Sequence, residues 1–268
     1  MDIGVLGSCM GRYSFAEFLD ATREMGAQCM ELPANPGFFQ GTLDLDDPAA
    51  VRREIEKRGL FVYAIGGGND FVQPTADGLQ AEVGKVRGQI DLAAAMGCDV
   101  VRTFGGEPKE GIPAEEYPDH LIKGYRAVIP YAEEKGIYLA MENHGWITND
   151  ADVEVRIVEA VGSDRMRLTV DTSNYRWFGL DLDTIADHYR KVAPHVIHTH
   201  LKDGSAERGK MGDYIALALG EGEIDLPLML SLLRDNGYQR ALCIEYEGAE
   251  DAKVGLAKGV AYLRQWGN

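Results

Sequence analysis

The sequence predicts a (β/α)8 barrel of the α/β class, formed as a single domain by residues 1–268. Its 268 residues are close to the ~250 that such a barrel needs. Eight apolar runs suit buried parallel strands, and each is followed by a stretch with helical periodicity. Each of the last four runs ends in an acidic residue or a histidine, at the barrel rim where active sites are built.

These elements alternate along the whole chain. The strands are expected near residues 2–7, 28–32, 60–65, 99–104, 137–142, 166–171, 195–200 and 240–245. The helices are expected near residues 14–25, 47–58, 78–97, 115–135, 151–161, 182–192, 226–236 and 250–265. No Pro-, Gly- or Ser-rich linker divides this series, so one domain is predicted.

Local signals mark the ends of several helices. A glycine stands just before the next strand in the segments MGAQ, KRGLF, MGCDV, EKGIY and NGYQR, as expected for a helix C-cap. An aspartate opens the helices in TNDADVE and EIDLPLM, as expected for an N-cap.

A doubly wound open sheet is the rival architecture. It would need a nucleotide-binding fingerprint after the first strand, and neither LGSCMGR nor IGGGND fits G-x-G-x-x-G. We interpret these glycines as tight strand-to-helix turns or as points where the backbone closely approaches a ligand.

Composition limits the partners. The formal net charge is −16, from 27 Lys+Arg against 43 Asp+Glu, which disfavours nucleic acid and anionic lipid. No apolar run reaches the ~20 residues of a membrane helix, and the N-terminus lacks the basic region of a secretory signal. The four cysteines form no CxxC pair, so free thiols and a cytoplasmic location are expected.

Four residues form the strongest functional signal. Glu142, Asp171, His200 and Glu245 each lie at the end of a predicted strand, spaced by 29, 29 and 45 residues. Three carboxylates and one imidazole meeting at one rim suit one divalent metal ion. Structural ion pairs are the alternative, but few cations are expected inside the barrel. His198 points to the same side as His200 but lies deeper, so His200 is the predicted ligand.

Several neighbouring residues are candidate substrate contacts. His144 is either a contact to a substrate hydroxyl, with a possible proton-relay role, or a plain loop side chain. Asn174 either binds substrate or caps the following turn. Lys202 is the best local cation, and Trp177 either walls a sugar pocket or only packs. The long segment between His200 and Glu245 is expected to form a loop that closes over the substrate, with mobility predicted across 204–214.

The C-terminal half resembles the xylose isomerase-like superfamily of sugar and sugar phosphate isomerases and epimerases. The resemblance rests on the segments ENHG at 142–145, LTVDTSN at 168–174, HTHLKD at 198–203, LGEGEID at 219–225 and IEYEG at 244–248. It implies that the four residues named above carry the metal, usually Mn²⁺, Mg²⁺, Co²⁺ or Zn²⁺.

The ketose 3-epimerases of this superfamily refine the expected roles. In them the two glutamates, matching Glu142 and Glu245, also act as the acid and base. These enzymes often carry a histidine where this chain has Asn174, and their substrate-gripping arginine has only Arg208 as a candidate here.

The predicted function is therefore a metal-dependent isomerase or epimerase of a sugar, keto-sugar or sugar phosphate. It would remove a proton next to a carbonyl to give a metal-stabilised enediolate. A dehydratase of a keto-sugar or dehydroshikimate-like substrate is the alternative. An endonuclease IV-type repair enzyme fits less well, because its site needs more histidines and this chain has none before His120. A non-catalytic sugar-binding protein, and a homo-oligomer of the chain, remain open.

Overall fold

Eight parallel strands form the centre of the molecule, as the sequence predicts. The structure is a computed structural model that describes residues 1–268 except 36, 42, 207–211 and 267–268. The sheet has the order β10-β1-β2-β3-β4-β5-β6-β7. Its strands are β1 (Ile3–Leu6), β2 (Cys29–Pro33), β3 (Phe61–Gly66), β4 (Val100–Thr103), β5 (Tyr138–Glu142), β6 (Met166–Asp171), β7 (Val196–His200) and β10 (Leu242–Ile244).

The two edge strands of this order, β7 and β10, meet and close the barrel. Leu201, just past β7, donates its N–H to Cys243 O at 2.8 Å and accepts from Glu245 N at 3.0 Å. Leu201 and Ile244 also form a parallel bridge. The predicted (β/α)8 barrel is therefore confirmed.

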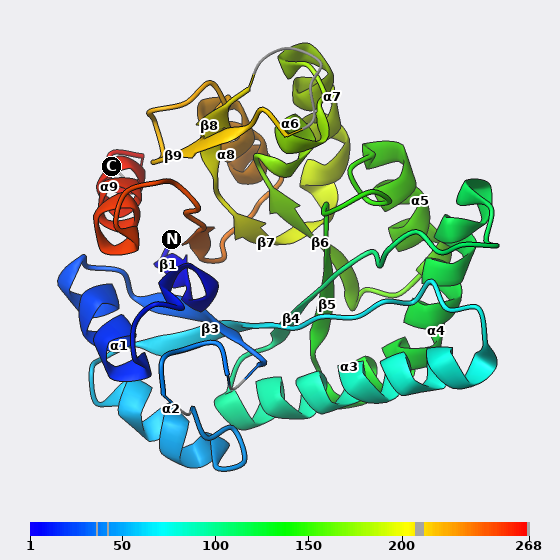
Figure 1. Ribbon diagram of the computed structural model, residues 1–268, viewed down its shortest axis with the longest axis horizontal. Helices are drawn as coiled ribbons and strands as arrows, with labels where there is room; N and C mark the ends of the chain where they lie inside the picture. The colour runs from blue at the N-terminus through cyan, green and yellow to red at the C-terminus, as the bar shows by residue number, and fades with distance from the viewer. Residues whose placement is uncertain (36, 42, 207–211, 267–268) are drawn as a thin grey trace.

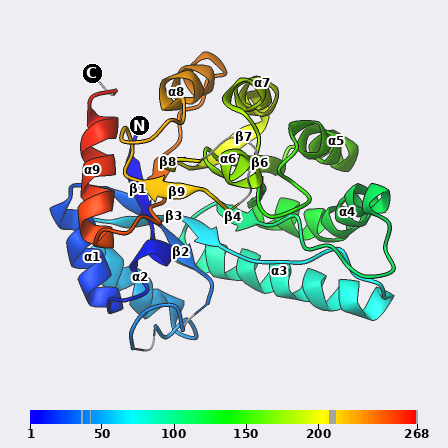
Figure 2. The same cartoon turned by 45° about the horizontal axis from the view of Figure 1, so that its top comes forward.

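A ring of helices surrounds the strands (Figure 1), and the tilted view in Figure 2 shows them along the outside of the barrel. The main helices are α1 (Phe15–Glu24), α2 (Pro48–Glu56), α3 (Ala76–Met96), α4 (Tyr117–Lys135), α5 (Ala151–Val161), α7 (Leu182–Val192), α8 (Leu226–Asp235) and α9 (Ala252–Arg264). Short 3-10 turns are η1 (Gly7–Met10), η2 (Ala114–Glu116) and η3 (Ala193–His195).

Two of the five predicted glycine C-caps and both predicted aspartate N-caps are present. Gly26, Gly59 and Gly237 also have positive φ, but they follow the residues that cap their helices. Gly97 and Gly136 end α3 and α4 with φ of 78° and 72°, a left-handed conformation that glycine adopts without a Cβ clash. Asp150 and Asp225 begin α5 and α8, and each side chain accepts a backbone N–H of the first turn. Local signals thus fix where these helices begin and end.

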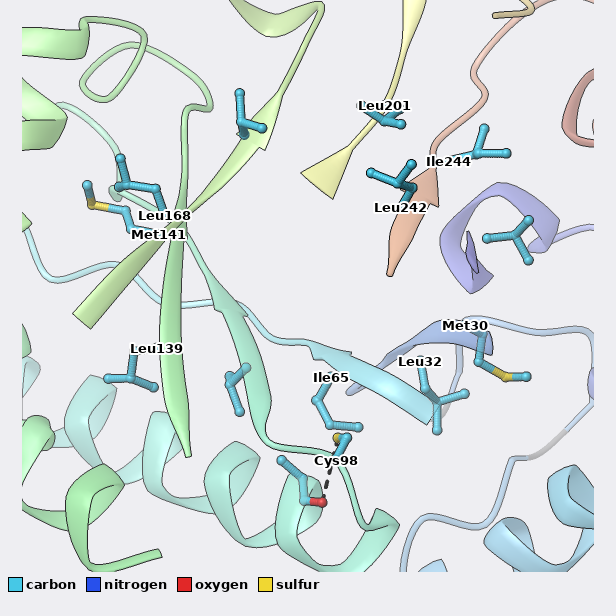
Figure 3. Packing of buried hydrophobic residues seen from close by; sticks show 14 of the residues in the cluster. Met30, Leu32, Ile65, Cys98, Leu139, Met141, Leu168, Leu201, Leu242 and Ile244 are labelled. Atoms are coloured by element: carbon cyan, nitrogen blue, oxygen red, sulfur yellow. Dashed lines mark hydrogen bonds between the residues drawn. The ribbon is translucent and has the colours of Figure 1, made fainter. Parts of the chain in front are cut away.

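Hydrophobic side chains form two layers. The larger layer lies between strands and helices and includes Met30, Leu32, Leu139 and Met141 (Figure 3). A smaller one fills the barrel interior and includes Ala140 and Cys243. Because successive residues of a strand face opposite sides, the residues that alternate with the outer layer point into the barrel.

Two elements differ from the sequence prediction. The short helix α6 (Asn174–Phe178) follows β6, where only a turn is expected. The segment after β7, expected as a loop, contains an antiparallel hairpin of β8 (Asp203–Ser205) and β9 (Ile215–Leu217). Part of the expected mobile segment, residues 207–211, lies outside the described residues.

The Asp203 carboxylate explains why the base of this hairpin is ordered. It accepts backbone N–H groups of Gly204, Gly220, Gly222 and Ile224 at 2.8–3.2 Å. Neither α6 nor the hairpin has a strong local periodicity, so both depend on contacts made in the folded chain. No helix in the described part of the chain is both long and apolar enough to span a membrane.

Candidate metal centre and active site

Four side chains meet inside the C-terminal end of the barrel. They are Glu142 at the end of β5, Asp171 at the end of β6, His200 at the end of β7 and Glu245 directly after β10. Each offers one ligand atom, and these atoms all lie within 4.8 Å of one another. The structure thus brings together the four residues that the sequence proposes as metal ligands.

His200 presents a defined nitrogen to this cluster. Its Nδ1 lies 3.1 Å from Glu245 Oε2 and 3.5 Å from Glu142 Oε1. Its Nε2 faces the other way and lies 2.8 Å from Glu31 Oε2. Nδ1 is therefore the nitrogen available to an ion.

The donor set fits a divalent cation. Within the described part of the chain, Glu142 Oε2, Asp171 Oδ2 and His200 Nδ1 are buried and have no hydrogen-bond partner. Buried polar atoms normally have partners, because leaving one unpaired costs about 1–3 kcal/mol. A cation bound between them would satisfy all three at once.

Hydrogen bonds hold the ligands in place. Asp171 Oδ1 accepts the N–H groups of Ser173 and Asn174 at 2.8 and 2.9 Å, which leaves Oδ2 for an ion. Asn143 fixes the backbone of Asp171 with two bonds, one to its N–H and one to its carbonyl. Such support orients a ligand before the ion arrives.

Cations are more abundant here than the sequence suggests. Lys202 Nζ lies 3.1–3.3 Å from carboxylate oxygens of Asp171, Glu245 and Glu247, and the Lys202 side chain is only 7% exposed. Arg102, from β4, places Nε 3.4 Å from Glu142 Oε2. The expectation of few interior cations is wrong, because Arg102 reaches the site from within β4 and Lys202 from just past the end of β7.

The charges hold most of these groups ionised. Burial disfavours the Glu142 carboxylate, but His200 and Arg102 outweigh it and lower its pKa to about 2. Burial is likewise outweighed at Glu245, whose pKa is lowered by Lys202 and His200. For Asp171, burial raises the pKa to about 7 against the opposing effect of Lys202. The cluster is thus electrostatically unfavourable at Asp171 without an added cation.

Sequence reasoning missed two residues of the site. Glu31 on β2 is 2% exposed, and its Oε2 lies 2.7 Å from His198 Nε2 as well as 2.8 Å from His200 Nε2. Arg102 reaches both Glu31 and Glu142. The available signal was a glutamate inside the apolar run CMELP and an arginine inside VVRTF, which are costly positions unless paired.

The predicted substrate residues take different places. Asn174 donates from Nδ2 to Glu142 Oε1 at 3.1 Å and to Asn143 O at 2.9 Å, so it contacts a ligand directly. His144 is exposed, with its ring 4.6 Å from that of Phe104. Trp177 is half-buried in α6. Arg208 lies outside the described residues.

Two cavities flank the cluster. One of about 530 Å³ has Glu245 in its wall, together with Cys9, Arg12, Tyr13 and Glu247. The other, of about 670 Å³, is lined by Glu31, the glycines at 66–68, Arg102 and Phe104. Ser8 and Phe38 border both cavities. Their volumes fall within the ~300–1,000 Å³ of small-molecule sites.

The fold and this cluster define a (β/α)8 barrel that carries a candidate metal centre at its C-terminal end. A family model described as xylose isomerase-like TIM barrel matches residues 19–266. The chain belongs to this family, and the resemblance inferred from the sequence is confirmed.

Individual relatives are distant. Uncharacterized protein MJ1188 of Methanocaldococcus jannaschii is 22% identical over 261 residues, covering 92% of this chain and 89% of the relative. The IOLI protein, solved with a zinc atom, has a TM-score of 0.80 and 18% identity, with 99% of this chain and 96% of that chain covered. D-psicose 3-epimerase from Clostridium cellulolyticum H10, solved with D-tagatose, has a TM-score of 0.78 and 15% identity, with 99% and 98% covered.

Proposed function

We propose that the protein is a divalent-metal-dependent isomerase or epimerase of a sugar, keto-sugar or sugar phosphate. The observation that carries this proposal is the cluster of Glu142, Asp171, His200 and Glu245, which lies beside two cavities. In the described part of the chain, three of its buried ligand atoms have no hydrogen bond. The zinc-bound and sugar-bound neighbours of the same fold are consistent with it. Mn²⁺, Mg²⁺, Co²⁺ and Zn²⁺ are the candidate ions.

An ion held by these residues would act as a Lewis acid and make the C–H beside a substrate carbonyl more acidic. The protein itself supplies the base. Glu142 is ionised at neutral pH because its pKa is about 2, and it faces the same centre as Glu245 from another strand. One glutamate therefore takes the proton and the other contacts the opposite side of the substrate.

The return of the proton decides the product. Delivery to the same carbon from the other face gives an epimer, and delivery to the neighbouring carbon gives the isomer. Glu245 is ionised in the resting site, so it must gain a proton before it can deliver one. Lys202, whose Nζ lies 3.3 Å from Glu245 Oε2, keeps its own proton because the surrounding carboxylates raise its pKa, so solvent water would supply the proton that Glu245 delivers.

The test combines metal content with proton exchange. Protein purified without chelator should contain one divalent ion per chain by elemental analysis. Ketoses, keto-glycosides and their phosphates in D₂O should then show deuterium entering one carbon by NMR. Loss of a β-hydroxyl would instead indicate the dehydratase, and binding without exchange would indicate a sugar-binding protein.

Asp171→Asn is the matched control. Its amide oxygen can still accept the two backbone N–H groups that Asp171 Oδ1 accepts, but the charge toward the ion is gone. We expect this variant to lose the ion and the exchange together. A wild-type protein that takes up no ion, or a variant that exchanges as fast as wild type, would refute the proposal.

A further inference from the structure

Glu31 is the buried carboxylate beside the metal ligands that the proposed chemistry does not use. Its side chain lies inside the barrel because Glu31 alternates with the outward-facing Met30 and Leu32 along β2. Its two oxygens contact three partners, which are His198, His200 and Arg102. A residue that touches a candidate ligand on the side away from the ion can set that ligand's orientation.

Two strand irregularities bring these partners together. The β2–β3 register shifts at Glu31 and leaves Tyr63 without a partner, and the β6–β7 register shifts before His198 and leaves Ile197 without one. The two unpaired residues bond to each other, with Tyr63 OH donating to Ile197 O at 2.8 Å. Such irregularities re-aim nearby side chains, here Glu31 and His198.

Gly66 makes room for the Glu31 carboxylate. A Cβ at Gly66 would lie 2.4 Å from Glu31 Oε1, closer than any real contact. Gly66 and Gly67 do not adopt positive φ, so the tight-turn interpretation of the glycines in IGGGND is wrong for these two. Instead, their missing Cβ atoms leave room for close neighbours. Gly66 lies against the Glu31 side chain, and Gly67 lies against the Arg102 carbonyl and the Gln89 side chain.

Arg102 contacts Glu31 and links it to a metal ligand. Its Nη1 donates to Gly67 O at 2.8 Å, its Nη2 lies 3.4 Å from Glu31 Oε1, and its Nε lies 3.4 Å from Glu142 Oε2. The guanidinium also lies over the Phe104 ring, 4.1 Å from its centroid. One cation therefore connects Glu31 and Glu142.

The chemistry of Glu31 determines where the protons of both histidines lie. An ionised carboxylate only accepts hydrogen bonds, so His198 and His200 must each carry a hydrogen on Nε2 to bond with Glu31 Oε2. A neutral His200 with its hydrogen on Nε2 has a free lone pair on Nδ1. That nitrogen is the one that faces Glu142 and Glu245.

We propose that Glu31 is a positioning residue that fixes the hydrogen of His200 on Nε2 and thereby presents Nδ1 to the metal ion. The proposal deepens the proposed function and rests on it for the identity of the ion. It also assigns a purpose to Arg102, which contacts Glu31 Oε1, and to Gly66, whose missing Cβ leaves room for that oxygen.

Glu31→Gln tests this with little change of shape. The amide oxygen should turn to Arg102, so the amide NH₂ faces the histidines and His200 Nε2 must accept. The hydrogen then moves to Nδ1 and blocks the ion. We expect Zn²⁺ affinity, measured by chelator competition at fixed pH, to fall about 10–100-fold, the range for lost ligand support.

Two-bond ¹H–¹⁵N spectra of histidine-labelled protein give a readout that does not depend on activity. We expect wild type to show a hydrogen on His200 Nε2 with and without Zn²⁺, and Glu31→Gln to lack it. Glu154→Gln is the matched control, since Glu154 is 1% exposed and bonds to Tyr175. It should leave Zn²⁺ affinity and the His200 spectrum unchanged.

Gly66→Ala is an independent second variant, since its methyl group would push on Glu31 Oε1 and should also weaken Zn²⁺ binding. Wild-type affinity and an unchanged His200 spectrum in Glu31→Gln would overturn the proposal. If wild type binds no Zn²⁺, the proposed function fails separately. The His200 spectra of metal-free wild type and Glu31→Gln then still test whether Glu31 holds a hydrogen on Nε2.

Discussion

The two ends of the barrel treat charge in opposite ways. At the N-terminal end, Arg240 donates from Nη1 and Nη2 to the two oxygens of Asp99 at 2.9 and 2.8 Å. Arg165 and Arg240 both lie over the Tyr138 ring, at 4.3 and 5.1 Å from its centroid. Each of these three charged side chains has an opposite charge or an aromatic face beside it.

At the C-terminal end, carboxylates outnumber the cations that reach them. Glu31, Glu142, Asp171 and Glu245 gather around His200, and ligand atoms of three residues remain without hydrogen bonds in the described structure. The charges named at the N-terminal end are paired within the protein, whereas the C-terminal end has buried ligand atoms that a bound cation would satisfy. In one barrel, the N-terminal end thus contributes to stability and the C-terminal end holds the candidate active site.

The largest expected effect concerns Lys202, the cation that partly neutralises the C-terminal end. Lys202→Met removes a buried ammonium from three carboxylates, and breaking such a buried pair typically costs about 3–5 kcal/mol. We expect the free energy of unfolding, measured by urea titration with chelator at pH 8, to fall by this amount. Added Mn²⁺ should restore much of the loss. Unchanged unfolding with a raised KM would instead make Lys202 a substrate contact.

The next effect concerns the proposed acid and base. Glu142→Gln and Glu245→Gln should each retain some metal, since an amide oxygen coordinates weakly. Each should lose turnover by about 100-fold or more, which corresponds to an increase of about 2.7 kcal/mol in the activation free energy. One variant can still exchange substrate hydrogen with D₂O without forming an epimer. Near wild-type turnover with bound metal would reduce both glutamates to ligands.

An effect that is smaller for each pH unit concerns a buried carboxyl outside the cluster. Burial raises the pKa of Glu154 well above its ordinary value, so the folded protein keeps a proton that the unfolded chain loses above about pH 4.3. The free energy of unfolding therefore falls as pH rises from the unfolded-state pKa to the raised pKa of the folded state, by up to about 1.4 kcal/mol per pH unit.

Glu154→Gln cannot lose this proton, and its amide oxygen can still accept from the Tyr175 hydroxyl. We expect its stability advantage over wild type to grow from pH 4 to pH 7 in denaturant titrations. A difference that stays constant with pH would show that Glu154 is ionised in the fold. Glu154→Gln and wild type should bind Zn²⁺ with the same affinity.

The smallest effect belongs to the N-terminal end. Asp99 and Arg240 side chains are 47% and 27% exposed, so their pair contributes about 0.2–1 kcal/mol. Asp99→Asn should lower stability by no more than this and leave metal affinity and turnover unchanged. A large loss of turnover would mean that the two ends of the barrel are energetically coupled.

The sequence by itself determined the repeating pattern of the fold and the four residues of the cluster. Apolar runs of strand length, glycine C-caps such as Gly97 and aspartate N-caps such as Asp150 are local signals, and they gave the barrel strands and main helices correctly. The strand-end positions of residues such as Asp171 and His200 then implied that they converge, because parallel strands of a barrel end at one rim.

Only the tertiary structure decided what surrounds those residues. Glu31 and Arg102 come from early strands, and their contacts with His200 and Glu142 join residues 40 to 169 positions apart. The register shifts at Tyr63 and Ile197 have no local signature, yet they aim Glu31 and the histidines. Side-chain alternation predicts which face a residue takes, but long-range packing decides which partner it meets there.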